Sequence, residues 1–381
     1  MVGSAIEFSS ILLTTYVDVD SSPEEDERVL ALAVEQAVEL GRHGVYPWTT
    51  EHHFRGAWQS SPLQFMTHVA PQLPAGCYVG FGVLSVPYHH PVRLVEDMNL
   101  LDQLTKGHSV FGLGSGFPNP YERPGMGVEE EHHVSGRAAR EAIEIMERLW
   151  AYQTGDEPFE FDNGLHRGRV EKRVVPAPYR RQRPTIIRTA STEQATLTAA
   201  EKGWPVFLGT MGMPLVEQWT TYRRALAAAG HPQAAVEECL RWSTVDWLSV
   251  LVADADEEAE AAAAEAKAER LAERERFFQT YRGGVLGPVA GDVLTSDAFR
   301  AGADMLHTIA GSPDTVAAEV RKLVDLGVNH LIVRFLGEWL GKTRGLLERS
   351  LELFAEDVAP RFADIPPLTE PLAAEAGLAR S

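Results

Sequence analysis

Three features are scarce in this sequence, and each scarcity excludes a class of protein. Only two cysteines occur in 381 residues, Cys77 and Cys239, and they form neither a CxxC pair nor a disulfide framework. Lysine and arginine number 35 against 54 aspartates and glutamates, so the formal charge is −19 and no polybasic stripe is available for nucleic acid. The chain has no uncharged apolar run of about 18 residues and no secretory signal pattern. We therefore expect a cytoplasmic protein that binds neither nucleic acid nor a membrane.

Short apolar runs alternate with helical patterns along most of the chain, which is typical of parallel βαβ units. The predicted strands are residues 8–14, 44–50, 78–86, 109–114, 185–190, 205–209, 245–252 and 330–335. Eight strands close a (β/α)8 barrel, whereas doubly wound open sheets more often have fewer. The sequence therefore predicts an α/β protein built as a (β/α)8 TIM barrel.

The segments between these strands carry helix signals. A serine followed by proline marks two helix starts, at Ser21 or Ser22 before Pro23 and at Ser312-Pro313, because proline needs no hydrogen bond at the first helical position. The other predicted helices span residues 62–69, 92–104, 137–151, 192–202 and 214–229.

Two stretches are longer than a barrel requires. Residues 116–184 follow the fourth strand, and residues 254–305 follow the seventh, beginning with an Ala- and Glu-rich helix at 256–276 and continuing into a Gly-rich loop expected to be mobile. Long loops after strands are where barrels hold their chemistry. We expect one domain over residues 1–365, with 254–305 as an insertion and a tail at 366–381.

Two adjacent histidines, His52 and His53, end the second predicted strand. That end of a barrel strand faces the active site, and histidine serves there as a general base or hydrogen-bond donor. Adjacent strand residues point to opposite faces, so at most one of the two enters the site, and a purely structural histidine is the alternative. The histidine pairs show no HxH, HExxH or two-histidine-one-carboxylate spacing, so no metal site is predicted.

Two further segments lie at predicted strand ends. The run from Phe111 through Gly112, Gly114 and Gly116 to Phe117 fails the dinucleotide fingerprint, which leaves close backbone approach to a ligand or a tight turn. Residues 189–192, Thr-Ala-Ser-Thr, precede a predicted helix, where hydroxyls and backbone N–H groups bind a phosphate or simply cap the helix.

Taken together, these segments resemble the bacterial luciferase-like, flavin-dependent monooxygenase family. The stretch at 87–107, in which His-Pro-Val-Arg is followed by an acidic helix and Leu-Asp-Gln, looks much like a segment of the luciferase α subunit. The motif Glu-His-His-Phe at 51–54 is similarly placed and spelled. The resemblance covers residues 7–230 and 311–362.

The resemblance implies a TIM barrel that oxidises a small organic substrate with dioxygen and reduced FMN, through a 4a-hydroperoxyflavin. It implies that a separate flavin reductase supplies the reduced FMN as a diffusible co-substrate, and it leaves open whether light is emitted. It also implies a homodimer formed through the helices at 62–69 and 92–104.

The resemblance assigns roles to particular residues. His52 matches the catalytic histidine, and a non-proline cis peptide beneath the flavin ring is placed at Gly82-Val83. The cofactor-binding residues it implies are Gly82, Val83, Gly114, Ser115, Phe117, Ala190, Ser191 and Thr192. Those implied for the substrate pocket are Trp48, His53, Tyr121 and Glu122.

One departure from the family pattern concerns the flavin phosphate. Luciferase has an arginine after the fourth strand, and this sequence has Ser115 there. Losing that charge-assisted pair weakens phosphate binding unless another base, such as Arg188, replaces it. The departure leaves two alternatives open: a deazaflavin-dependent oxidoreductase of the same superfamily, and a non-catalytic flavin-binding subunit.

Overall fold

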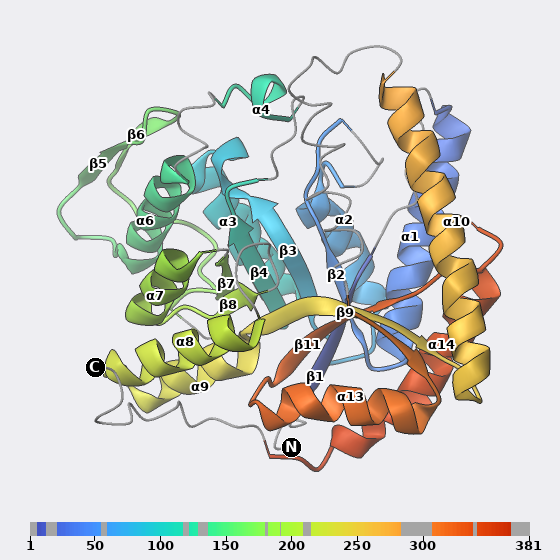
Figure 1. Ribbon diagram of the computed structural model, residues 1–381. Coiled ribbons are helices and arrows are strands. Elements are labelled where there is room, and N and C mark those ends of the chain that lie inside the picture. The colour runs from blue at the N-terminus through green and yellow to red at the C-terminus, as the bar shows by residue number, and fades with distance from the viewer. Residues whose placement is uncertain are drawn as a thin grey trace.

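Eight parallel strands close into a barrel, as the sequence predicts (Figure 1). The ring order is β1 (Glu7–Ile11), β2 (Tyr46–Thr49), β3 (Val79–Ser85), β4 (Ser109–Gly114), β7 (Thr185–Thr189), β8 (Val206–Leu208), β9 (Thr244–Val252) and β11 (His330–Phe335). Parallel pairing of β8 with β9 closes the ring. The computed structural model describes residues 6–12, 21–54, 59–116, 122–128, 136–179, 182–190, 192–208, 215–282, 307–337 and 341–366.

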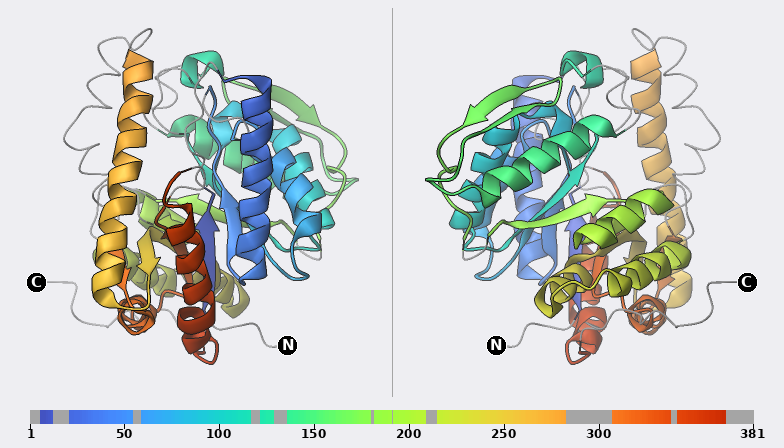
Figure 2. Two further views of the ribbon diagram at one scale, coloured as in Figure 1. Left: turned by 90° about the vertical axis from the view of Figure 1, so that its right-hand side faces the viewer. Right: turned by 90° about the vertical axis from the view of Figure 1, so that its left-hand side faces the viewer.

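Helices surround the barrel on the outside (Figure 2). They are α1 (Pro23–Arg42), α2 (Pro62–Val69), α3 (Pro91–Leu104), α6 (Arg137–Ala151), α7 (Glu193–Lys202), α8 (Leu215–Ala228), α9 (Gln233–Trp242), α10 (Asp256–Arg282), α13 (Pro313–Asp325) and α14 (Arg344–Leu353). Short turns of other helix types lie at Ala70–Gln72, Val86–Tyr88, Phe354–Val358 and Ala359–Phe362. Helices α9 and α14 were not predicted. None of the helices in the described part of the chain has the length and apolarity needed to span a membrane.

The start of α1 illustrates how local sequence sets a boundary. Ser22 is the N-cap: its hydroxyl accepts a hydrogen bond from the Glu25 N–H at 3.3 Å, and the Glu25 carboxylate accepts one from the Ser22 N–H at 3.0 Å. This reciprocal capping box satisfies two donors that the helix leaves unbonded, and Pro23 follows at the first position. The predicted helix start is therefore confirmed.

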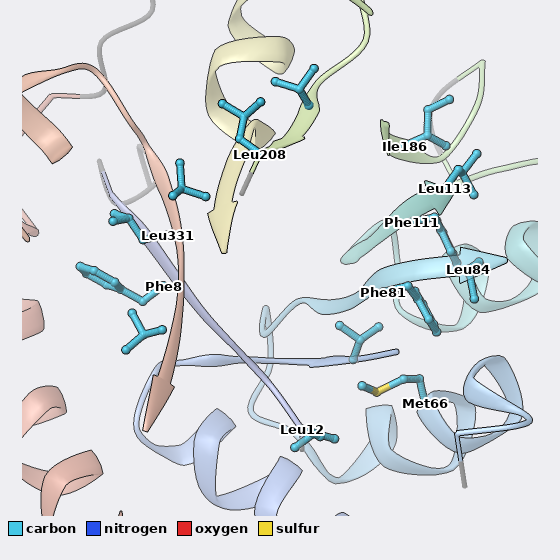
Figure 3. Packing of buried hydrophobic residues seen from close by; sticks show 14 of the residues in the cluster. Phe8, Leu12, Met66, Phe81, Leu84, Phe111, Leu113, Ile186, Leu208 and Leu331 are labelled. Atoms are coloured by element: carbon cyan, nitrogen blue, oxygen red, sulfur yellow. The ribbon is translucent and has the colours of Figure 1, made fainter. Parts of the chain in front are cut away.

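Apolar side chains pack in two layers. Between the strands and the helices, Phe81 and Phe111 stack with ring centroids 5.2 Å apart (Figure 3). Inside the barrel a second cluster includes Trp48, which is fully buried. A Cβ atom on Gly80 would lie 2.0 Å from the Trp48 ring, so the indole fills the space that a side chain at position 80 would need.

The two stretches that are longer than a barrel requires, 116–184 and 254–305, contain helices and strands as well as loops. Between β4 and β7 lie α4 (Glu122–Gly125), α6 and a hairpin of β5 (Phe159–Asp162) with β6 (Arg167–Val170). After β9, helix α10 runs along the outside of the molecule to the end where α4 lies (Figure 1), and β10 (His307–Gly311) pairs with β9 outside the ring. The predicted loop after α10, at 283–305, and residues 367–381 of the predicted tail lie outside the described residues.

Candidate active site

A buried carboxylate, Glu51, organises the residues that follow β2. Its Oε2 accepts a hydrogen bond from the Ser85 N–H at 2.7 Å, and its Oε1 lies 2.9 Å from Nε2 of His53 and 2.8 Å from Nε2 of His89. Burial by itself would raise the pKa of Glu51, but these hydrogen bonds and the charge of His89 outweigh it and hold the pKa at about 2. Because the ionised carboxylate can only accept, both imidazoles donate through Nε2.

The same pairing acts on His89. Burial would lower the pKa of this imidazole, but its hydrogen bond to Glu51 and the charges of Glu51 and Asp97 raise it above the usual value. Glu51 therefore connects the ends of β2 and β3 and favours a positive charge on His89.

His52 pairs with a second buried carboxylate, Glu122 of α4. The His52 Nδ1 lies 3.3 Å from Oε1 of Glu122, and the same oxygen accepts the His53 N–H at 3.2 Å. The Glu122 side chain is completely buried, whereas 18% of the His52 side chain is exposed. The structure thus brings together His52, His53 and Glu122, three residues that the sequence analysis assigned to the site.

Helix α4 is held in place by an aromatic contact. A Cβ on Gly125 would lie 2.4 Å from Cζ of Phe54, so the Phe54 ring rests directly on this glycine. Phe54 has a φ of +58°, a conformation that non-glycine residues rarely adopt, and its side chain is 55% exposed. The loop after β2 therefore contacts α4 at both Glu122 and Gly125.

Glycines line the neighbouring part of the barrel mouth. The peptide bond between Gly82 and Val83 is cis, as predicted from the resemblance. It lies where the pairing of β3 with β4 shifts register, between Phe81 and Leu84. A Cβ on Gly82 would lie 3.0 Å from Phe207 and 3.3 Å from Trp48, and one on Gly114 would lie 2.6 Å from Val83. Side chains at positions 82 and 114 would therefore crowd this region.

Trp48, predicted for the substrate pocket, lies in the barrel interior. Its ring contacts the positions beneath the mouth, at Gly80 and Gly82, and packs against Phe207 with centroids 6.4 Å apart. It is completely buried. Trp48 therefore supports the floor of the mouth.

Positive charge gathers where β4, β7 and α6 meet. Arg188 is half-buried and donates through Nη1 to the Leu113 carbonyl at 3.1 Å, one residue before Gly114. Burial and, to a smaller extent, the nearby Arg140 lower the pKa of Arg188 to about 10, partly opposed by Glu147, so it remains charged at neutral pH. A Cβ on Gly136 would lie 3.6 Å from Nη1 of Arg140 and 4.0 Å from Oγ of Ser115. Arg140 and Ser115 thus flank the same point.

After β7 the structure shows the predicted helix cap, and the anion site there stays a prediction. Thr192 caps α7, and its Oγ1 accepts the Ala195 N–H at 3.2 Å, while Ala190 is completely buried. The cap and the phosphate interpretations are compatible, since the other N–H groups of the first helical turn are left without helical partners. The predicted site residues Phe117, Tyr121 and Ser191 lie outside the described residues.

Arg140 and Tyr88 were not among the predicted site residues. A signal for Arg140 was available: the first turn of α6 contains no acidic residue and two arginines, Arg137 and Arg140, although a helix N-terminus favours acids. Tyr88 follows the end of β3, and its hydroxyl is buried next to Gly116. No local pattern marked it.

The stretch at 87–107 that carried most of the resemblance is largely structural. Asn99 accepts a hydrogen bond from Nε1 of Trp150 at 2.9 Å and donates to the Pro176 carbonyl at 2.8 Å. Asp102 accepts from Ser109 and from the Tyr179 N–H. These contacts fasten the segment before β7 to α3.

Within the described residues, no group of three or more histidine, cysteine, aspartate or glutamate side chains is arranged to hold a metal ion.

Comparison with known proteins gives one consistent family. A family model described as luciferase-like monooxygenase matches residues 8–330. The chain is 28% identical to the 4-hydroxyprotoasukamycin monooxygenase of Streptomyces nodosus subsp. asukaensis over 336 residues, which cover 83% of this chain and 82% of the relative. It is 26% identical to the limonene 1,2-monooxygenase of Rhodococcus erythropolis over 323 residues, covering 83% and 76%.

Solved structures agree on the fold. The oxygenating constituent of 3,6-diketocamphane monooxygenase from Pseudomonas putida, a type II Baeyer-Villiger monooxygenase solved with FMN, superposes with a TM-score of 0.70. It is 21% identical, and the alignment covers 95% of this chain and all of the other. The likeness supports the barrel architecture described above.

Proposed function

The chain belongs to the luciferase-like monooxygenase family, and from this premise we propose that it is an oxidoreductase that oxygenates a small organic substrate with reduced FMN and dioxygen. The observation that carries the proposal is the arrangement of the barrel mouth. The His52–Glu122 pair lies after β2, the glycines of β3 and β4 follow on the next strands, and Arg188 and Arg140 lie where β4, β7 and α6 meet.

The residues present fit a bound FMN. Arg188, Arg140, Ser115 and the N-terminus of α7 at Thr192 together offer charge and donors to a phosphate, which compensates for the arginine that Ser115 replaces. Gly82 and Gly114 carry no side chain of their own, so their backbone would approach the flat ring, and the Val83 side chain, which lies over Gly114, would contact it. Ala190, and the predicted contacts Ser191 and Phe117, would complete the cofactor site.

When bound, reduced FMN supplies the two electrons of the reaction. Substrate, reduced FMN and dioxygen give oxygenated substrate, oxidised FMN and water, so one oxygen atom enters the product and the other leaves as water. Since relatives with these folds differ in substrate, the scaffold alone does not fix the substrate, and its pocket is assigned to His53, Tyr121 and Glu122 over the floor at Trp48.

Proton transfer is assigned to His52. The Glu122 carboxylate orients the His52 ring through Nδ1, and the partly exposed imidazole lies at the mouth, where it can exchange a proton with bound groups. His53 is fixed by Glu51 and serves to position the neighbouring residues.

The main experiment mixes the purified protein and reduced FMN rapidly with aerated buffer. We expect oxidised flavin to reappear much more slowly than in free solution, because the site excludes water and holds the cofactor. His52→Ala should shorten this delay, whereas His43→Ala, at the opposite end of the barrel, should not change it. Reoxidation at the rate of free flavin would refute the proposal.

The same experiment tests the other assignments. Supplying reduced FMN with a flavin reductase and NADH, in place of chemically reduced FMN, tests whether a separate reductase can deliver the cofactor. Photon counting in the presence of an alkanal measures light emission. Identical traces for His52→Ala and the wild type would favour a non-catalytic flavin-binding subunit.

The second candidate function is hydride transfer with a reduced deazaflavin, which Ser115 motivates. Arg188 and Arg140 weaken that motive, since they restore positive charge beside Ser115. Comparing the affinities of reduced FMN and reduced deazaflavin separates the two, and tighter binding of the deazaflavin would favour the second.

A further inference from the structure

Tyr88 carries a buried hydroxyl that the proposed chemistry does not use. Only 8% of the residue is exposed, and among the described residues no group forms a hydrogen bond with its hydroxyl. Burying a hydroxyl without a partner costs free energy, so such a group in a native site calls for an explanation. A ligand acceptor is one explanation that the surroundings of Tyr88 support.

The hydroxyl lies at the barrel mouth. A Cβ on Gly116 would be 3.0 Å from the Tyr88 hydroxyl oxygen and 3.4 Å from Oγ of Ser85, so both hydroxyl groups border the space over this glycine. The Tyr88 ring packs edge-on against His53, with centroids 5.5 Å apart and planes at 75°. Tyr88 therefore stands between the histidines after β2 and the backbone after β4.

The charges around Tyr88 define the ligand it can accept. Burial and the charge of Glu122 raise the pKa of the Tyr88 hydroxyl. The charge of Arg123 lowers it and that of Glu51 raises it further, so the hydroxyl remains a neutral donor at physiological pH. Two carboxylates nearby disfavour an anionic ligand at this point. A neutral oxygen acceptor, such as a carbonyl, satisfies the donor without repulsion.

We propose that the Tyr88 hydroxyl donates a hydrogen bond to a neutral carbonyl oxygen of a ligand bound at the barrel mouth, and that Tyr88 thereby positions this ligand. The inference rests on the proposed monooxygenase function and deepens it. Two sources offer this chemistry, a carbonyl of the flavin ring and a carbonyl of the organic substrate. Trp48 also has a buried, unbonded donor, but its Nε1 faces Gly80 in the barrel interior and does not serve a ligand at the mouth.

The test compares Tyr88→Phe with Tyr222→Phe. Tyr222 is also buried but donates to the Trp204 carbonyl at 2.7 Å, away from the mouth. Removing the Tyr222 hydroxyl should lower the melting temperature by roughly 2 °C, because it leaves an acceptor unbonded. Removing the Tyr88 hydroxyl should leave the melting temperature unchanged or raise it. Tyr222→Phe should keep the wild-type kinetics.

Ligand binding should be affected by Tyr88→Phe and not by Tyr222→Phe. We expect Tyr88→Phe to weaken one ligand about fivefold to tenfold, the effect of one lost hydrogen bond. A higher dissociation constant for FMN, measured by flavin fluorescence, identifies the flavin carbonyl. A higher KM for a bicyclic ketone such as camphor, with unchanged KM for limonene, which has no carbonyl, identifies the substrate.

The outcomes separate the two proposals. If wild-type protein binds FMN and turns over but Tyr88→Phe matches it in both ligand measurements, the inference about Tyr88 is wrong and the proposed function stands. The same conclusion follows if Tyr88→Phe lowers the melting temperature as Tyr222→Phe does, with no change in ligand affinity. If wild-type protein neither binds FMN nor oxygenates either probe, the proposed function fails and this inference fails with it.

Discussion

Glu51 shows how a single side chain can stabilise a site without touching a substrate. It is almost fully buried, yet three donors hold its pKa at about 2, below the usual 4.5. A lowered folded-state pKa means that the carboxylate contributes stability above pH 4.5 and that this contribution is lost as the pH falls toward 2. The pKa of His89 is raised in the folded protein, so its pH dependence has the opposite sign. His89 contributes stability below its usual pKa of 6.5, and this contribution is lost as the pH rises through its pKa in the folded protein. Both contributions are present between about pH 4.5 and 6.5.

We predict that Glu51→Gln lowers the free energy of unfolding by about 3 kcal/mol at pH 6. Lowering the pKa of a buried, paired carboxylate from 4.5 to about 2 corresponds to a free energy of that size. Urea denaturation at a series of pH values measures it. The difference from the wild type should shrink as the pH falls below about 4.5. The control Glu171→Gln removes an exposed ion pair with Arg169 and should leave the free energy of unfolding nearly unchanged. A constant difference at all pH values would contradict the assignment.

A second prediction concerns Arg188 and Arg140. Replacing either by methionine should weaken FMN binding about tenfold or more, because each contributes charge to the phosphate. Riboflavin lacks the phosphate, so its affinity should stay the same in both variants, and Arg349→Met, an exposed substitution on α14, should affect neither ligand. Equal losses for FMN and riboflavin would show that the arginines support the ring site or the fold instead.

Part of the candidate site could be predicted from the sequence at the level of single residues. His52 and His53 could be assigned because they stand in the Glu-His-His-Phe motif that ends a strand, and Glu122 because it lies in the long loop after the fourth strand. Tyr88 could not, since its role depends on how the turn after β3 packs against the end of β4, and the basic first turn of α6 marks Arg140 without placing it beside Ser115. Such contacts join distant segments and leave no local periodicity.

At the scale of elements, the four-residue helix α4 is the piece that brings Glu122 to His52. It has too few residues to be stable alone, so its position depends on Phe54 resting on Gly125 and on Glu122 accepting from the His53 N–H. A short element held by such tertiary contacts is sensitive to small changes.

We predict that Gly125→Ala reduces kcat several-fold with a stability loss below about 1 kcal/mol. The added methyl meets the far end of the Phe54 ring, which is 55% exposed and can swing away, so α4 loses its support while the core is unaffected. Gly345→Ala, in a helix with open space around the new methyl, should keep kcat and raise stability by about 0.5–1 kcal/mol. Steady-state kinetics and thermal unfolding check both, and an unchanged kcat in Gly125→Ala would count against this role of α4.

The strands of the barrel were the most predictable elements, because parallel strands buried on both faces form continuous apolar runs. The hairpin of β5 and β6 was missed because its four-residue strands lie partly exposed and pair only with each other. Strand β10 was missed because it gains its conformation from pairing with β9 outside the ring. Both cases reflect tertiary contacts that a local pattern does not contain.

At the scale of the whole molecule, α3, one of the helices through which the resemblance implies a homodimer, carries two exposed leucines. Leu100 and Leu104, one turn apart, are 48% and 57% exposed. Asn99 and Gln103 bind the carbonyls of Pro176 and Ala177, so the segment that begins with the exposed Val175 runs alongside the same helix. Exposed apolar side chains gathered in one place favour association.

We predict that the wild-type protein has twice the chain mass of 41.9 kDa in solution and that Leu100→Glu with Leu104→Glu yields the monomer. Charged side chains in an apolar interface lose hydration without gaining a partner. Size-exclusion chromatography with light scattering measures both masses, and Val216→Glu, another exposed apolar residue on α8, should leave the mass unchanged. A monomeric wild type would overturn the homodimer proposal.

The packing of Trp48 on Gly80 makes two positions on neighbouring strands depend on each other. Any side chain at position 80 enters the indole ring, and any smaller residue at position 48 leaves a cavity inside the barrel. Across relatives of this chain, a larger residue at 80 should therefore accompany a smaller one at 48. Deepening the mouth above Gly82 by design requires substitutions at both positions together, because either substitution alone gives a poorly packed barrel interior.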